Sequence, residues 1–309
     1  MTTDPWAAQH PFLAKEASSL GISERRLRSP EYRQVLHGVL IRADVPDTLV
    51  VRSRAALLLA PPGSVLSHWT AARLWGGTTP DDPWIHLTLL ARSHVRVGGI
   101  RHHRHRHLLE ITRRHGMPVT SPLQTFGHLA RGTSLTDLVA LGDSLVRKQR
   151  FSIPDLLAYT ALWSGQCRHA AVAAARLVRE GVDSAPETHL RLLMVLAGLV
   201  EPEVNIVIHD ADGQVRYRLD LGFRAQRLAI EYDGRWHNTP EQQAHDEIRR
   251  AELRDQGWSF VVVTADDLDG DPGVLLHCLA TAMAEHGIPV PARFSDEWRP
   301  FFRCPTHVA

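Results

Sequence analysis

The chain has 309 residues, which is enough for about two domains of ordinary size. Its 44% hydrophobic and 22% charged residues are close to globular averages, which excludes disordered, collagen-like and coiled-coil chains. No apolar run approaches the ~18 residues of a membrane-spanning helix, and the first residues lack the layout of a signal peptide. The three cysteines form no CxxC pair, so we expect a cytoplasmic protein without a disulfide framework and without membrane contact.

The two halves of the chain carry opposite net charge. Residues 184–309 contain 12 Arg, no Lys and 20 Asp+Glu, a net charge of −8. Residues 1–183 contain the remaining 23 Lys+Arg and 14 Asp+Glu, a net charge of +9. A basic surface attracts polyanions and clustered carboxylates hold divalent cations, so we expect different roles for the two halves. Ordinary surface charge is the alternative.

Residues 1–80 are predicted to form a small helical region with one strand. The expected elements are a helix that opens at Ser23, a strand over Val35–Ala43, and helices over residues 53–60 and Ser67–Trp75. Short helices followed by a wing-like strand are compatible with a winged helix-turn-helix, which binds DNA. Arg25 and Arg26, in the first of these helices, are then candidate DNA contacts.

Residues 81–183 are predicted to hold a β-hairpin followed by a helical connecting region. Alternating residues over Trp84–Leu90 and His94–His103 predict the hairpin. Residues 122–181 have a helical pattern, with Pro154 at a helix start.

The densest basic run in the sequence is RHHRHRH, Arg101–His107. The favoured interpretation is a solvated edge strand or a phosphate-contacting surface, because no acidic or cysteine partner lies nearby. The candidate DNA contacts in this run are Arg101, Arg104 and Arg106. The alternative is a transition-metal site on one face of a strand, formed by His103, His105 and His107.

The pattern of residues 184–309 predicts the order helix, three strands, helix, strand, helix. A capping-box pattern at Ser184 opens the first helix, and the Asp212-Gly213 pair predicts a tight hairpin. The expected elements are a helix from Ser184 to about Gly198, strands over Val204–Ile208, Gln214–Phe223 and Arg227–Asp233, a helix over 239–256, a strand over Trp258–Thr264 and a helix over 272–286.

Three carboxylates fall on two neighbouring predicted strands. Asp220 lies inside a strand, where aspartate is disfavoured without a partner, and Glu231 and Asp233 project from one face of the next strand. If the short turn after Asp220 pairs the strands, Asp220 lies beside Glu231, and a divalent cation would offset the repulsion between them. Oxygen ligands suit Mg²⁺ or Mn²⁺. The alternative is that Asp233 belongs to a turn and that Glu231 pairs with an arginine such as Arg218 or Arg227.

The stretch RLDLGFRAQRLAIEYDGRWH, followed by HDEIRRAELRDQGWSFVVVT, resembles the endonuclease-like domain related to very-short-patch repair endonucleases, in the PD-(D/E)XK superfamily. The resemblance covers about residues 184–270. It includes the strand aspartate, the E-x-D-G-x-x-H run, the D-x-x-R pair and the GW before the last strand. It implies an α+β chain whose residues 184–309 form a restriction-endonuclease-like α/β domain with a mixed four-stranded sheet, preceded by a winged-helix-like and mixed α/β region.

The resemblance also implies a set of site residues. Asp220 and Glu231 would hold the metal, Mg²⁺ or Mn²⁺. The further catalytic residues that it implies are Asp233 as a ligand or water-positioning group, Glu187 on the first helix, and His237 as a general base or acid. Arg249, paired with Asp246, would face a phosphate.

The sequence departs from the superfamily pattern at two positions. Leu219 precedes Asp220 where the pattern has proline, and Asp233 stands in place of the usual lysine. The zinc ligands that brace very-short-patch repair enzymes have no evident counterpart.

The stretch PVTSPLQTFGHLAR, Pro118–Arg131, resembles the AbiEi-antitoxin-like regulators that often precede this nuclease-like domain in actinobacteria. The N-terminal part of that family is a winged helix-turn-helix. The resemblance implies DNA as a partner, together with a toxin or defence-system protein.

Two functions from different classes remain open. The first is a metal-dependent DNA endonuclease with an N-terminal DNA-binding region, in which one protomer nicks DNA and a homodimer cuts both strands. The second is a non-catalytic DNA-binding regulator or antitoxin-like protein with a degenerate nuclease fold. The missing lysine favours the regulator, whereas the joint presence of Asp220, Glu231, Asp233 and His237 favours the enzyme.

Overall fold

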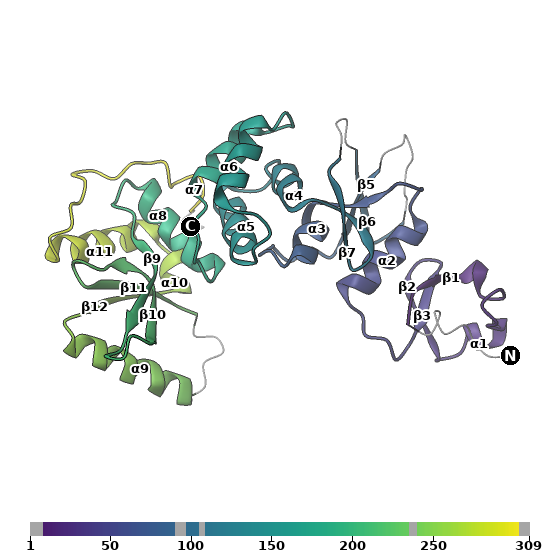
Figure 1. Ribbon diagram of the computed structural model, residues 1–309, viewed down its shortest axis with the longest axis horizontal. Helices are drawn as coiled ribbons and strands as arrows, with labels where there is room; N and C mark the ends of the chain where they lie inside the picture. The colour runs from purple at the N-terminus through teal and green to yellow at the C-terminus, as the bar shows by residue number, and fades with distance from the viewer. Residues whose placement is uncertain (1–8, 90–96, 105–108, 235–239, 303–309) are drawn as a thin grey trace, which may run out of the picture. The chain divides into compact units, whose positions relative to one another are not determined.

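The computed structural model describes the chain except for residues 1–8, 90–96, 105–108, 235–239 and 303–309 (Figure 1). The chain forms an N-terminal unit of residues 1–132 and 150–172 and a C-terminal unit of residues 133–149 and 173–309. The sequence predicts three segments instead, 1–80, 81–183 and 184–309. Residues 133–149 join the C-terminal unit because their helix packs on the helix that follows Ser184.

The first part of the N-terminal unit is a three-stranded antiparallel sheet in the order β1-β3-β2. Its elements are β1 (Phe12–Leu13), the 3-10 helix η1 (Ala14–Glu16), α1 (Glu24–Leu27), β2 (Tyr32–Leu36) and β3 (Val39–Arg42). Ser23 caps α1 as predicted, because its side chain accepts the backbone N–H of Arg26. The small core contains Phe12, Ala17, Ile22 and Tyr32.

The prediction of one strand over Val35–Ala43 is wrong. The segment forms the antiparallel pair β2 and β3, with Leu36 opposite Val39. The turn is made by His37 and Gly38, and Gly38 has a φ of +78°, which a glycine adopts without strain.

The second part of the N-terminal unit is a mixed five-stranded sheet in the order β6-β5-β4-β8-β7. Its strands are β4 (Val65–Leu66), β5 (Ile85–Leu89), β6 (Ile100–Arg104), β7 (Ile111–Arg114) and β8 (Met117–Thr120). The helices α2 (Leu49–Leu59) and α3 (His68–Trp75) match the two predicted helices, and Gly76 ends α3 in a left-handed conformation.

The predicted hairpin between Trp84–Leu90 and His94–His103 is wrong. β5 and β6 pair in parallel, with Ile85 opposite Ile100, because alternation of side chains does not encode strand direction. The hairpin of this region is instead β7 and β8, joined through His115 and Gly116, which both have positive φ.

The predicted helical stretch over residues 122–181 is confirmed. It consists of α4 (Pro122–Leu129), α5 (Leu135–Arg147), α6 (Ile153–Leu162) and α7 (Arg168–Leu177). Ser152 and Asp155 form a capping box at the start of α6, and Pro154 lies in its first turn, where the missing N–H costs nothing.

The C-terminal unit has the predicted element order with one short additional helix. Its elements, besides α5, are α8 (Ala185–Leu196), β9 (Glu203–His209), β10 (Val215–Phe223), β11 (Leu228–Asp233), α9 (Pro240–Asp255), β12 (Ser259–Thr264), α10 (Ala265–Asp269) and α11 (Pro272–Glu285). The mixed four-stranded sheet has the order β12-β11-β10-β9, in which only the β11–β12 pair is parallel.

Helices cover the sheet of the C-terminal unit. Figure 1 shows α9 on one side of the sheet and α8 with α11 on the other. Leu253 of α9 packs with Leu219 and Ala229 of the sheet, and Trp258 closes this core cluster. The chain is therefore an α+β protein, as predicted. None of the helices in the described part of the chain has the length and apolar content needed to cross a membrane.

Candidate functional site

Asp220 and Glu231 lie beside each other on neighbouring strands of the C-terminal unit. β10 and β11 pair antiparallel with Leu221 opposite Ile230, and this register places Asp220 opposite Glu231, as the sequence predicts. Oδ2 of Asp220 accepts the backbone N–H of Tyr232 at 3.0 Å, which ties this carboxylate to β11.

Two arginines of helix α9 bind Glu231, whose exposure is only 3%. Arg249 donates from Nη1 to Oε1 at 2.8 Å and from Nη2 to Oε2 at 3.0 Å, which is a bidentate pair. Arg250 donates from Nε to Oε2 at 3.0 Å. An ion pair of Glu231 is therefore present, but its partners are Arg249 and Arg250 and not the predicted Arg218 or Arg227.

Arg249, predicted to face a phosphate, is committed within the protein. Besides Glu231 it contacts the backbone oxygen of Arg218 at 3.2 Å and the carboxylate of Asp246 at 3.7 Å. Arg250 has a second partner in Glu247 at 3.3 Å. The side chain of Arg249 keeps 20% of its surface exposed, whereas that of Arg250 keeps 8%. Arg249 is consequently the member of this pair that an external anion can reach.

The environment of Asp220 opposes its ionisation. Burial raises the pKa of this half-buried carboxyl to about 7, and the negative charges of Glu187 and Glu231 add to the effect. The Tyr232 N–H and the Arg249 guanidinium lower the same pKa by less. Because the pKa of Asp220 is raised to near neutral pH, we infer that neighbouring groups do not fully compensate the negative charge of its ionised form.

Glu187 lies in the first turn of α8 with both carboxylate oxygens occupied. Oε1 accepts from the Ser184 hydroxyl at 2.7 Å, and Oε2 accepts the Asp183 N–H at 3.0 Å. Burial is the main cause that raises the pKa of Glu187. Glu187 affects the site because its negative charge raises the pKa of Asp220, but it does not line the cavity described next.

A cavity of about 300 Å³ lies where β10, β11 and α9 meet, and we call it the acidic cavity. It is lined by Asp220, Glu231, Tyr232, Asp233, Gly234, Asp246, Arg249 and Arg250. The structure thus gathers three of the predicted catalytic residues with Arg249. His237 lies outside the described residues.

The residues of the acidic cavity fit a divalent cation in part. Asp220 and Asp233 supply carboxylate oxygens, which hard cations prefer, and the raised pKa of Asp220 marks a charge that a cation would offset. Glu231 does not fit in this conformation, because guanidinium groups bind both of its oxygens. Coordination by Glu231 would require Arg249 to leave.

The predicted DNA-contacting arginines of the N-terminal unit differ in their exposure to solvent. Arg25, Arg101 and Arg104 are exposed, and the guanidinium of Arg101 lies 5.6 Å from the centre of the Trp84 ring. Arg26 is instead held by the carboxylate of Glu31, with Nε donating at 3.1 Å. Arg106 lies outside the described residues.

A group of histidines that the sequence does not predict converges in the N-terminal unit. Ring nitrogens of His68, His86 and His103 all lie within 4.8 Å of one another. Burial lowers the pKa of His86, and it lowers the pKa of His103 to about 4, so both rings are neutral at neutral pH. His105 and His107, the predicted neighbours of His103, lie outside the described residues. For the described part of the basic run, Arg101–Arg104, the predicted edge position is confirmed, because β6 lies at one edge of its sheet.

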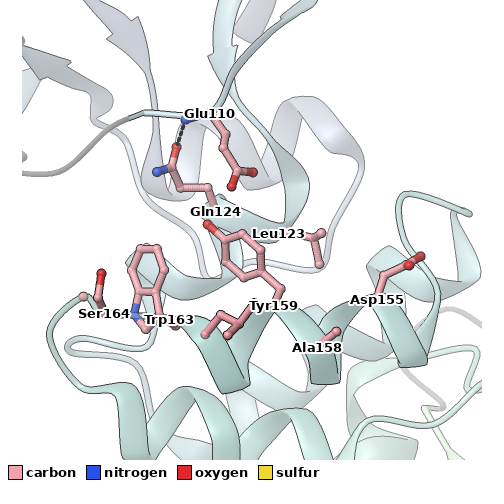
Figure 2. A pocket seen from close by; sticks show the side chains of 10 residues that line it. Glu110, Leu123, Gln124, Asp155, Ala158, Tyr159, Trp163 and Ser164 are labelled. Carbon is pink, nitrogen blue, oxygen red and sulfur yellow. Dashed lines mark hydrogen bonds between the residues drawn. The ribbon is translucent and has the colours of Figure 1, made fainter.

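A larger cavity, of about 620 Å³, lies elsewhere in the N-terminal unit. Figure 2 shows the ring of Tyr159, on α6, pointing from that helix toward Gln124 of α4 and Glu110, which precedes β7. Tyr159 stacks on Trp163 with ring centres 5.7 Å apart, and burial raises the pKa of its hydroxyl. The lining combines aromatic surface with few charged groups, and the sequence contains no signal for this cavity.

No known family profile matches the chain. Two proteins of Mycobacterium tuberculosis are similar to it over most of their length: the uncharacterized protein Rv2248 of strain ATCC 25618 / H37Rv and the uncharacterized protein MT2308 of strain CDC 1551 / Oshkosh. Each is 32% identical over 273 residues, which cover 82% of this chain and 94% of the relative. The chain belongs to the same family as these two mycobacterial proteins.

Proposed function

We propose that the protein is a metal-dependent DNA endonuclease, with DNA binding in the N-terminal unit and cleavage in the C-terminal unit. The acidic cavity is the main support for this proposal, because it combines carboxylates with Arg249, which can bind two oxygens of one group at once. Hydrolysis of a phosphodiester needs ligands for a cation and a positive group for the phosphate.

The topology of the C-terminal unit supports the proposal. A helix precedes three antiparallel strands. The helix α9 then connects β11 to β12, and these two strands pair in parallel. This order and the mixed four-stranded sheet are those implied by the resemblance to the PD-(D/E)XK superfamily. Asp220 and Glu231 lie on the second and third of these strands.

Each residue of the acidic cavity then has a role. Asp220 and Asp233 would hold Mg²⁺ or Mn²⁺, and Glu231 would join them after Arg249 leaves. The bound cation would polarise the scissile phosphate and lower the pKa of a water molecule. Arg249 would exchange the carboxylate of Glu231 for two phosphate oxygens, so its guanidinium stays paired throughout. His237 would transfer a proton; this role is proposed because of the place of His237 in the E-x-D-G-x-x-H run.

The N-terminal unit supplies the proposed DNA-binding surface. We assign α1 and the β2–β3 hairpin to a winged-helix-like module and β6 to a basic edge. The net charge of +9 over residues 1–183 favours attraction of the DNA backbone. The exposed Arg25, Arg101 and Arg104 are the proposed phosphate contacts.

Replacing one of these arginines is expected to lower the salt dependence of DNA binding. For Arg25→Gln or Arg101→Gln, the slope of log K against log salt should fall in magnitude by about 0.9, since one phosphate contact is lost. Fluorescence anisotropy with a labelled duplex at several salt concentrations measures the slope. Arg299→Gln, at an exposed arginine of the C-terminal unit paired with Asp296, should leave it unchanged. Equal slopes for all variants would show that these arginines contact no phosphate.

Cleavage of supercoiled plasmid tests the proposed activity. With Mg²⁺ or Mn²⁺ the wild-type chain is expected to nick the plasmid, and EDTA should abolish nicking. Asp220→Asn should slow nicking by at least about 10²-fold, the scale on which loss of one electrostatic stabiliser acts. Its matched control is Asp212→Asn, which changes an exposed aspartate in the β9–β10 turn and should cleave like the wild type.

The outcome of the plasmid assay separates the two functions. Nicking that survives in both EDTA and Asp220→Asn would come from a contaminant and would contradict the proposal. An absence of nicking by folded wild type that still binds DNA would support the second candidate, a non-catalytic regulator with a toxin or defence-system partner.

One observation favours that second candidate. The pairing of Glu231 with Arg249 and Arg250 satisfies the buried carboxylate without a cation. A degenerate nuclease fold would retain such ion pairs for stability alone, and the lysine missing at position 233 agrees with it.

A further inference from the structure

We propose that His68, His86 and His103 bind a transition-metal ion of the zinc type, with Asp82 orienting His86. The site lies in the N-terminal unit, so it is separate from the acidic cavity and does not rest on the nuclease proposal. Among the described residues, these three histidines form the one group of three or more potential metal ligands whose donor atoms all lie within 4.8 Å of one another.

Three different elements bring the histidines together. His86 lies on β5 and is buried, and His103 lies on the neighbouring edge strand β6. Nε2 of His103 is 2.9 Å from Nδ1 of His86. His68 is the first residue of α3, and its ring stacks on that of His103 with centres 3.6 Å apart.

The hydrogen bonds of His86 direct one of its nitrogens toward His103. Oδ2 of Asp82 lies 3.1 Å from Nε2 of His86, so the carboxylate holds the proton on Nε2 and leaves the lone pair on Nδ1. Asp82 is itself fixed, because its Oδ1 accepts the N–H of Trp84 at 2.8 Å. A carboxylate behind an imidazole is the usual second partner of a metal-binding histidine.

The backbone of His68 is held in an uncommon conformation. Its φ is +49°, in the left-handed region that costs a residue with a Cβ free energy. Nδ1 of His68 lies 2.9 Å from the hydroxyl of Ser67, which helps to fix the orientation of the ring. Strain of this kind concentrates at ligand-binding positions.

The donor set decides the class of metal. Three neutral imidazoles suit Zn²⁺, Co²⁺, Ni²⁺ or Cu²⁺, whereas Mg²⁺ and Ca²⁺ require oxygen ligands. Two nitrogens on a tetrahedral Zn²⁺ lie ~3.4 Å apart, given Zn–N bonds of about 2.0–2.1 Å. The His86–His103 pair would therefore open slightly, and the His68 ring would rotate out of its stack. Water would take the fourth position.

Cobalt titration of the full-length chain tests the site. After treatment with EDTA and its removal, Co²⁺ is added in the presence of excess Mg²⁺, which occupies oxygen-rich sites but not three imidazoles. We expect one equivalent of Co²⁺ to give the visible absorption of a tetrahedral ion, and one equivalent of Zn²⁺ to displace it. A wild-type protein that shows no such absorption would overturn the proposal, leaving the histidines as a hydrogen-bonded stack.

Matched variants assign the ligands. His103→Gln should weaken Co²⁺ binding by at least 100-fold, and Asp82→Asn by 10–100-fold, as for other partners of metal-bound histidines. His102→Gln, the adjacent histidine on β6, is the control and should bind like the wild type. Circular dichroism verifies that each variant is folded. Equal affinity in folded His103→Gln and wild type would place the metal elsewhere and refute the assignment.

Discussion

The variant Asp220→Asn is expected to be more stable than the wild type at pH 8, by up to about 4 kcal/mol, and to gain nothing at pH 3. The pKa of Asp220 is about 7 in the folded chain against an ordinary value of 3.8. The protonated carboxyl of Asp220 therefore makes its full contribution to stability below pH 3.8, and this contribution is lost as the pH rises through about 7. Asparagine resembles the protonated form at every pH, and its side-chain oxygen can still accept the Tyr232 N–H.

Denaturation by urea in EDTA at pH 8 and at pH 3 measures this difference. The control Asp212→Asn changes an exposed carboxylate of a turn and should match the wild type at pH 8 within about 0.5 kcal/mol. If Asp220→Asn is instead less stable than the wild type at pH 8, the ionised carboxylate stabilises the fold. That result would contradict the description of Asp220 as an uncompensated charge.

Added metal should narrow the stability difference between wild type and Asp220→Asn at pH 8. At a Mg²⁺ concentration 100 times the dissociation constant, wild type gains about 2.7 kcal/mol, whereas Asp220→Asn, having lost a ligand, gains little. The same experiment separates the two proposed functions, because a non-catalytic regulator without a cation site gains nothing from Mg²⁺ in either form. A stability cost that a cation relieves is the signature of a site kept for function.

The elements of the C-terminal unit could be predicted because their signals are local. Ser184 accepts an N–H at the start of α8, and the pairing of β10 with β11 follows from the short turn between them. Asp220 beside Glu231 was predictable for the same reason, since strand register follows turn length.

The partners of Glu231 could not be predicted in the same way. Arg249 and Arg250 lie on α9, and their contact with β11 depends on where that helix packs on the sheet, which no local pattern encodes. The convergence of His68, His86 and His103 also depends on tertiary packing and could not be predicted. The sequence places His103 in a basic run, but His68 and His86 join it only through the parallel pairing of β5 and β6 and the placement of α3.

Arg191→Met is expected to lower the free energy of unfolding by about 3–5 kcal/mol, because it leaves a buried carboxylate without its cation. Arg191, on α8, is fully buried, and its guanidinium lies 3.3 Å from Oδ2 of Asp143 on α5 and 2.9 Å from Oε1 of Glu201. It also donates to the backbone oxygen of Leu177 at 2.8 Å. Methionine fills similar volume, so the loss would report mainly charge and hydrogen bonding.

Urea denaturation of the full chain at neutral pH measures the loss. Arg147→Met is the control, because Arg147, at the end of α5, also pairs with a carboxylate, that of Asp183 at 3.1 Å, but both side chains are exposed. Exposed pairs of this kind contribute about 0–1 kcal/mol. A loss for Arg191→Met no larger than that of the control would show that the buried ion pair does not hold α5 to α8.

A second substitution separates the charge from the shape of the site. In the wild type, Asp143 is 1% exposed and also accepts the Arg179 N–H at 2.7 Å and the Thr188 hydroxyl at 2.8 Å, two donors that Arg191→Met does not remove. Asp143→Asn preserves an acceptor for one of these donors and removes the uncompensated charge, so the double variant should recover part of the lost stability. Burial already raises the pKa of Asp143 with Arg191 present, so the single variant should lose less at pH 5 than at pH 8, as the carboxyl takes up a proton. The same pH dependence should be absent from the double variant, since asparagine does not titrate.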